Sequence, residues 1–304
     1  GHASNVNEDI IRAAVDLFIE RGLADVGFQF IGIDDCWMRM SPAEYQRIIN
    51  TNDRFYLSKH EGIDFNKLVG EARDADGRIL TNSYFPDMKG LVDYIHEQGL
   101  KAGIYSSPGP KTCQNLAGSY EHQQADARQY AEWGFDLLKY DQCSATALIN
   151  EAKENEPDFR TRDFWAPMIQ YLEETDRDFV FNLCQYGEDQ PWEWGPAIGA
   201  HSWRIAGDLN HYVDNYFRDA CRIATELRDF SGPGHWNDPD FIYIGRQIQT
   251  RDNHFVESSP VPLDTNQQYQ YVTLWAMICA PFFFSTDVFN VTDFTIGLLT
   301  NPEV

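Results

Sequence analysis

Basic residues are scarce in this chain. Its 304 residues include 24 lysines and arginines against 47 aspartates and glutamates, which gives a formal net charge of −23 at pH 7. Nucleic-acid binding requires a cationic face that displaces counterions from phosphates, and an anionic lipid surface repels an acidic protein. The composition therefore predicts that neither a nucleic acid nor a membrane is a partner.

Long hydrophobic runs are absent as well. The longest apolar stretch, residues 274–284, has 11 residues counting its proline, whereas roughly 20 are needed to span a bilayer. No transmembrane helix is expected. Hydrophobic residues still make up 43% of the chain, which is enough to bury the core of one large barrel or of two ordinary domains.

Metal-binding sequence patterns are missing too. The six cysteines contain no CxxC pair, and the eight histidines contain no HxH or HExxH motif. Zinc sites depend on such spacings. We therefore expect no metal and no other cofactor.

Stretches with helical periodicity alternate with short β-branched and aromatic runs. The helical stretches are residues 7–21, 87–98, 122–133, 164–174, 211–227 and 266–277, and the strand-like runs are residues 28–33, 101–106, 135–140, 179–184, 202–205, 241–245 and 282–285. This order is typical of α/β proteins with βα units around a parallel sheet. Residues 39–83 fit no such unit and are predicted to be an insertion with little structure or a short helix.

Aspartates lie at five of the seven apparent strand ends, at Asp34 and Asp35, Asp141, Asp208, Asp238 and Asp240, and Asp287. In a (β/α)8 barrel the C-terminal strand ends meet on one face and form the active site. An isolated aspartate after a strand, by contrast, often only caps the next helix. We favour a shared site because further functional side chains occupy the same ends. These are Trp37, Tyr105, Lys139, Trp203 and Arg204.

A pocket with several carboxylates and aromatic rings, one lysine and one arginine suits a neutral, polyhydroxylated ligand. Carboxylates accept hydrogen bonds from sugar hydroxyls, and the faces of Trp and Tyr cover the apolar side of a sugar ring. Glycoside hydrolysis also requires two carboxyl groups in different protonation states. The pattern therefore predicts a carbohydrate site with candidates for both catalytic groups.

Seven motifs, in order, carry a resemblance over almost the whole chain to glycoside hydrolase family 27, the α-galactosidase and α-N-acetylgalactosaminidase family. They are IDDCW (33–37), GLKAGIYSSPGPKTC (99–113), YAEWGFDLLKYDQC (130–143), NLCQYG (182–187), SWRIAGD (202–208), PGHWNDPD (233–240) and LLTNPEV (298–304). The resemblance implies a (β/α)8 TIM barrel, with residues 1–304 as its catalytic domain and the insertion on the active-site rim. It also implies that the family's first strand and C-terminal β-sandwich lie outside this chain, which predicts an exposed gap between the first and last strands.

The resemblance assigns the two catalytic carboxyl groups of a retaining mechanism. Asp141 is the expected nucleophile, kept ionised with help from Lys139. Asp208 is the expected acid/base, and the apolar Ile205 and Ala206 before it predict less polar surroundings that favour its protonated form. The alternative for Asp208 is a purely structural salt bridge with Arg204.

The resemblance also assigns sugar contacts, which together predict a galactose-containing oligosaccharide or polysaccharide as the partner. Asp34 and Asp35 would hold the O4 and O6 hydroxyls with Trp37 beside them, and Gln185 lies in the loop that reads the 2-substituent. The residues expected at the ring oxygens or on the pocket rim are Tyr105, Lys139, Arg204, Asp240 and Phe241.

The resemblance further implies a disulfide between Cys113 and Cys143, with two buried free thiols as the alternative. One disulfide favours an exported protein, secreted or periplasmic. The remaining four cysteines, Cys36, Cys184, Cys221 and Cys279, are expected to be small core residues.

Three functional hypotheses follow. The first is an exo-acting retaining α-galactosidase. The second is the same machinery acting on a β-L-arabinopyranoside, an α-N-acetylgalactosaminide or an isomalto-oligosaccharide, and the altered loop at Gln185 and the insertion keep it open. The third is a non-catalytic sugar-binding relative. The sequence predicts no oligomeric state.

Overall fold

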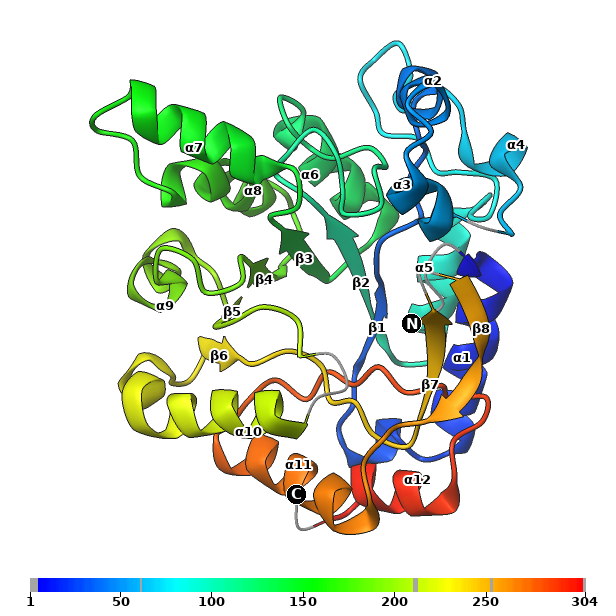
Figure 1. Cartoon of the computed structure of the whole chain (residues 1–304), viewed down its shortest axis with the longest axis vertical. Coiled ribbons are helices and arrows are strands. Elements are labelled where there is room, and N and C mark those ends of the chain that lie inside the picture. The colour runs from blue at the N-terminus through cyan, green and yellow to red at the C-terminus, as the bar shows by residue number, and fades with distance from the viewer. Residues whose placement is uncertain (1–4, 61, 210–212, 252–253, 303–304) are drawn as a thin grey trace.

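A six-stranded parallel sheet forms the centre of the computed structural model, which describes residues 5–60, 62–209, 213–251 and 254–302 (Figure 1). The strands pair in chain order, so each lies beside the next one along the chain. They are β1 (Phe30–Ile33), β2 (Lys101–Ser106), β3 (Leu137–Asp141), β4 (Val180–Cys184), β5 (Ser202–Arg204) and β6 (Trp236–Asp238). The first five match predicted strands, and the α/β prediction is confirmed.

Helices cover the outer face of this sheet (Figure 1). Those that connect successive strands or flank the sheet are α1 (Glu8–Glu20), α5 (Met88–Glu97), α6 (Gln123–Trp133), α7 (Ala145–Asn155), α8 (Arg162–Glu173), α9 (Pro191–Trp194), α10 (Val213–Arg222), α11 (Thr265–Met277) and α12 (Asp293–Leu299). Single turns add η2 (Ala24–Val26), η3 (Pro196–Ile198), η4 (Ile223–Leu227) and η5 (Arg228–Phe230). The predicted helix 211–227 is thus α10 followed by η4, and its first two residues lie outside the described part of the chain.

Helix α1 shows how the sequence determines these elements. The Asn7 side chain accepts a hydrogen bond from the amide of Ile10 and caps the helix, which satisfies one of its unpaired first-turn donors. Ile11, Val15 and Phe18 then fall on one face and are buried, as a period of 3.6 residues dictates. Within the described residues, none of the helices has the length and apolar character needed to cross a membrane.

Two predicted strands are wrong. Residues 241–245 and 282–285 meet only at a single parallel bridge between Ile242 and Phe284, which is too short to make strands. The sixth strand instead lies a few residues earlier, at β6, where three residues pair with β5. Such a short strand has no alternating pattern by which it could be predicted.

The predicted gap between the first and last strands is packed with aromatic rings. Phe284 stacks on Phe18 of α1 at a centroid distance of 6.1 Å and meets Phe28, just before β1, edge-on at 5.2 Å. Phe282 also contacts Phe28, at 6.3 Å. In the described chain no ladder of backbone hydrogen bonds joins β1 to this segment, so side-chain packing rather than strand pairing connects the two segments.

The insertion at residues 39–83 has more structure than expected. It contains α2 (Pro42–Asn50), α3 (Arg54–Lys59) and α4 (Phe65–Leu68), which lie together beyond the ends of β1 and β2 (Figure 1). An unpredicted antiparallel hairpin, β7 (Arg246–Arg251) and β8 (His254–Pro260), forms a second sheet. Both additions lie beside the central sheet rather than in it.

Candidate active site

The parallel register brings the predicted site residues to one edge of the sheet. Asp141 at the end of β3 pairs with Cys184 at the end of β4, and Arg204 at the end of β5 pairs with Asp238 at the end of β6. Since all six strands run the same way, their C-terminal ends lie on the same face, where (β/α)8 enzymes carry their chemistry.

Asp141 lies at the centre of this face and is 6% exposed. The Tyr105 hydroxyl donates a hydrogen bond to Oδ2 at 2.9 Å, and the Tyr186 hydroxyl donates to Oδ1 at 2.5 Å. Burial raises the pKa of the Asp141 carboxyl, while the Lys139 ammonium and the two phenol donors oppose the increase. The carboxylate therefore has both oxygens held by donors in a largely desolvated place, which restricts its orientation.

Lys139 is the basic residue that acts on Asp141 in this site. Its Nζ lies 2.8 Å from Asp34 Oδ2, 5.3 Å from the centroid of the Tyr105 ring and 4.8 Å from that of Phe241. Burial opposes ionisation of Asp34, but the Lys139 ammonium outweighs it and lowers the pKa of Asp34. Asp34 and Lys139 thus form an ion pair between two aromatic faces.

Asp35 lies next to this pair but has no cation. Its carboxylate accepts hydrogen bonds from the backbone amides of Cys36 at 2.7 Å and Gln114 at 3.0 Å. Burial, reinforced by the neighbouring Asp34 carboxylate, raises the pKa of Asp35 to about 7 against the hydrogen bonds that lower it. The pKa values of the two adjacent aspartates are therefore shifted in opposite directions.

Arg204 organises the opposite side of the face. Its buried guanidinium lies 3.1 Å from Asp208 and 3.2 Å from Asp240, and its Cζ is 5.8 Å from the ring centroid of Tyr186. Burial raises the pKa of Asp240 to about 6, although Arg204 opposes the increase. Tyr186 connects the two halves of the site, since its hydroxyl binds Asp141 and its ring lies against Arg204.

The predicted apolar surroundings of Asp208 are not found. Its side chain is 63% exposed, and its Oδ1 accepts a hydrogen bond from Arg204. Ile205 is buried at 1% exposure and packs into the core rather than around the carboxyl group. The loop after β5 turns the Asp208 carboxylate toward solvent, at the mouth of the site.

Two further predicted site residues are enclosed by protein. Trp37 is fully buried, packs edge-on against Tyr130 and Trp133 of α6, and donates from Nε1 to the Tyr105 carbonyl. Gln185 is also fully buried. In this structure Trp37 therefore supports the backbone of Tyr105.

Three residues in the loops of the site have an unusual backbone conformation. Cys36, Tyr186 and Asp240, each just after a strand, have positive φ angles of 86°, 59° and 100°, a conformation that non-glycine residues rarely adopt and that clusters at functional sites. Each one breaks the alternation of side chains along the strand. Tyr186 was missed for this reason, and its only sequence signal was an aromatic residue beside a strand-end glycine.

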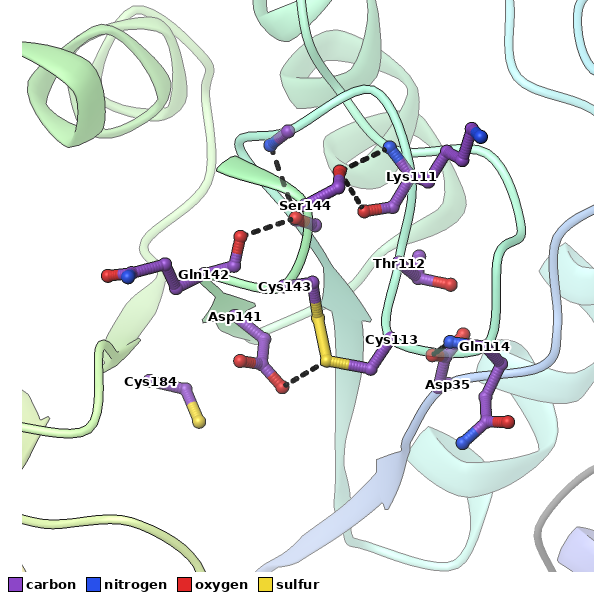
Figure 2. Close-up of a disulfide and its surroundings, with 12 residues drawn as sticks. Asp35, Lys111, Thr112, Cys113, Gln114, Asp141, Gln142, Cys143, Ser144 and Cys184 are labelled. Atoms are coloured by element: carbon purple, nitrogen blue, oxygen red, sulfur yellow. Dashed lines mark hydrogen bonds between the residues drawn. A yellow bond between two sulfur atoms is a disulfide. The ribbon is translucent and has the colours of Figure 1, made fainter. Parts of the chain in front are cut away.

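The predicted disulfide between Cys113 and Cys143 is confirmed, and it lies against Asp141 (Figure 2). The sulfur and carboxylate atoms of Cys113, Asp141 and Cys143 lie within 4.8 Å of one another, but the disulfide leaves no thiolate to bind a metal at this cluster. Cys36 and Cys184 are buried as expected, whereas Cys221 and Cys279 are exposed, contrary to the prediction that they are core residues.

Not every strand-end aspartate belongs to the site. Asp287 accepts hydrogen bonds from the Phe289 amide and the Asn290 side chain, so it only shapes its own turn. A cavity of about 330 Å³ lies further out, between α7, α8 and α9, with Lys153, Arg160, Asp189 and Trp194 among its lining residues. None of the residues around Asp141 or Asp208 described above lines that cavity.

Comparison with known proteins agrees with this geometry. The family model described as Alpha galactosidase A matches residues 62–304. The chain is 31% identical to α-galactosidase A of Cellvibrio japonicus over 98% of this chain and 62% of that protein, and 30% identical to an α-galactosidase of Cyamopsis tetragonoloba over 99% and 60%. The chain thus spans about 60% of the length of these curated relatives.

A solved structure shows the same fold. The structure of α-galactosidase I from Mortierella vinacea aligns with a TM-score of 0.74 and 28% identity, over 99% of this chain and 68% of that one. The sheet, the site face and the family match therefore point the same way. The chain belongs to glycoside hydrolase family 27, the α-galactosidase family.

Proposed function

We propose that this chain is the catalytic part of an exo-acting retaining α-galactosidase. The observation that carries the proposal is the placement of two carboxylates on one face. Asp141 is buried and held by two phenol hydroxyls, while Asp208 is exposed at the mouth. Retaining hydrolysis needs this division between a fixed nucleophile and a group that exchanges protons with the leaving group and with water.

In the first step, an Asp141 oxygen attacks the anomeric carbon while the glycosidic bond breaks, and Asp208 gives its proton to the departing oxygen. A glycosyl ester of Asp141 results. In the second step, Asp208 takes a proton from water, the water oxygen bonds to the anomeric carbon, and the Asp141 carboxylate leaves. The anomeric carbon inverts twice, so the released galactose keeps the α configuration.

Substrate binding supplies what Asp208 lacks in the free chain. Its carboxylate is exposed and paired with Arg204. A bound sugar covers this mouth and excludes water from around the carboxyl group. The role is thus compatible with the exposed position of Asp208.

Recognition of galactose is assigned to the ion pair and its neighbours. Asp34 and Asp35 hold the O4 and O6 hydroxyls, Lys139 contacts the ring oxygens, and Phe241 lies at the rim. The disulfide at Cys113 and Cys143 supports an oxidising compartment, since such bonds persist outside the reducing cytosol.

The test is release of p-nitrophenol from its α-galactoside, with NMR detection of the anomer formed first. We expect hydrolysis with α-galactose as first product, and loss of several orders of magnitude in rate for Asp141→Asn. Cleavage of the β-L-arabinopyranoside, the α-N-acetylgalactosaminide or an isomalto-oligosaccharide, with the galactoside untouched, would reassign the sugar. Binding of galactose without turnover of any substrate would indicate a non-catalytic relative.

A further inference from the structure

A tight turn at residues 112–116 connects the two sides of the proposed sugar pocket. The backbone N–H of Gln114 donates a hydrogen bond to the Asp35 carboxylate, and the preceding Cys113 forms the disulfide beside Asp141 (Figure 2). Asn115 has a positive φ of 61°, and its backbone N–H donates a hydrogen bond to the Thr112 carbonyl. Any movement of this turn therefore shifts Asp35 and the disulfide together.

The insertion holds this turn from the outside. Glu44 of α2 accepts hydrogen bonds from the Asn115 side chain at 3.0 Å and from Lys111 Nζ. The His60 ring donates from Nε2 to the Gln114 carbonyl at 2.9 Å. Gln114 thus contacts the insertion through its backbone carbonyl and the pocket through its backbone N–H.

Glu44 is an unusual residue for a rim insertion, because it is a carboxylate with only 6% exposure. Burial opposes its ionisation, but hydrogen bonds from Arg47 and Lys111 outweigh that opposition and lower the pKa of Glu44. Buried charges are expensive unless they are paired and hydrogen-bonded. Here the Glu44 carboxylate joins α2 to the 112–116 turn, which is distant in sequence, because it accepts hydrogen bonds from Asn115 and from the nearby Lys111.

We propose that Glu44 and His60 are positioning residues, and that the insertion sets sugar affinity by fixing the Gln114 amide against Asp35. The proposal deepens the proposed function and rests on it for the identity of the sugar. Neither side chain has to touch the ligand. Their effect is transmitted through the backbone of Gln114, whose N–H fixes the direction in which the Asp35 carboxylate points.

The kinetic test uses Glu44→Gln, which keeps the shape of the side chain but removes the charge facing Lys111. We expect KM for p-nitrophenyl α-galactoside to rise about tenfold with kcat changed less than about twofold, since a sugar contact present in both ground and transition states acts on KM. Lys111→Met should give a similar increase, and the double variant should be no worse than either single variant. Glu132→Gln, which removes an exposed carboxylate of α6 that pairs with Arg78 of the insertion, is the matched control.

A second measurement needs no substrate. In Glu44→Gln, hydrogen exchange of the Gln114 amide should speed up about tenfold or more, and the pKa of Asp35 measured by carboxyl NMR should rise because a hydrogen bond to its ionised form weakens. His60→Phe, which keeps the ring contact with Phe65, replaces Glu44→Gln if that variant does not fold.

The outcomes separate the two proposals. If the parent chain neither hydrolyses nor binds galactosides while Gln114 exchange responds to Glu44→Gln, the proposed function fails and the link from the insertion to the turn stands. Unchanged KM in an active Glu44→Gln enzyme, fully additive effects in the double variant, or unchanged Gln114 exchange would each overturn the positioning role.

Discussion

Asp35 is a carboxyl group whose environment changes strongly on folding. Burial raises its pKa to about 7 in the folded chain, whereas an unfolded aspartate keeps the ordinary value near 3.8. Between these values the folded state binds more protons than the unfolded state, so this group lowers stability as pH rises through that window. Asp240, with a pKa raised to about 6, acts in the same direction.

Replacing Asp35 by asparagine should therefore flatten the pH dependence of stability. We expect the unfolding temperature of the parent chain to fall between about pH 5 and about pH 8 by more than that of Asp35→Asn. Circular dichroism melts at the two pH values provide the measurement. Asp93→Asn, at an exposed position on α5, should behave like the parent, and parallel curves for all three chains would contradict the expectation.

If Asp141 is the nucleophile, Lys139 should determine the pH at which kcat/KM falls on the acidic side. The nucleophile must be ionised, so kcat/KM falls as pH drops through its pKa. Lys139 lowers that pKa, and Lys139→Met should move the acidic limb to higher pH. The pH profile of kcat/KM is the measurement, with Lys89→Met on the outer face of α5 as control. If the acidic limb of the kcat/KM profile does not shift in Lys139→Met, then either Asp141 is not the nucleophile or Lys139 does not control its pKa.

At the scale of elements, a buried ion pair attaches the insertion to the sheet's helical layer. Arg73 binds Asp126 of α6 through two nitrogens at 2.5 and 2.8 Å, and it also donates to the carbonyls of Gly77 and Gly118. Asp126 is fully buried. Losing one partner of such a pair leaves an uncompensated charge in the interior.

We therefore expect Asp126→Asn to lower the free energy of unfolding by about 3 kcal/mol. The same turn of the insertion offers an exposed counterpart, because Arg78 pairs with Glu132 of the same helix. Glu132→Gln should cost less than about 1 kcal/mol. Urea unfolding of both variants measures the difference, and equal losses would show that burial of the first pair does not govern its contribution.

At the scale of the whole molecule, aromatic packing substitutes for strand pairing between β1 and residues 282–285. Phe284 contacts both Phe18 and Phe28. Phe284→Ala should lower the free energy of unfolding by about 2–3 kcal/mol, less than for a fully buried ring because Phe284 is half-buried. Phe289→Ala, at a position 40% exposed, should cost less than about 1 kcal/mol. Chemical denaturation compares them, and similar losses would contradict a role of this ring in closure.

The sequence by itself determined the family, the alternation of helices and strands, five of six central strands and the disulfide partner of Cys113. These features depend on local periodicity and on motifs several residues long, which can be recognised in the sequence alone. The aspartates after β1, β3 and β5 were located the same way, since a parallel sheet places strand ends on one face whatever the details of the loops.

Only the tertiary structure decided how individual side chains point. Trp37 was expected beside the sugar but is buried, whereas Tyr186, which was not predicted as a site residue, binds Asp141. Cys36 and Tyr186 have positive φ angles just after their strands, and no sequence period records such a backbone conformation. The exposure of Asp208 and the aromatic closure at Phe284 likewise depend on segments far apart in sequence. The insertion became part of the site only through Glu44 and His60, because their hydrogen-bond partners on the 112–116 turn are brought to them by the fold.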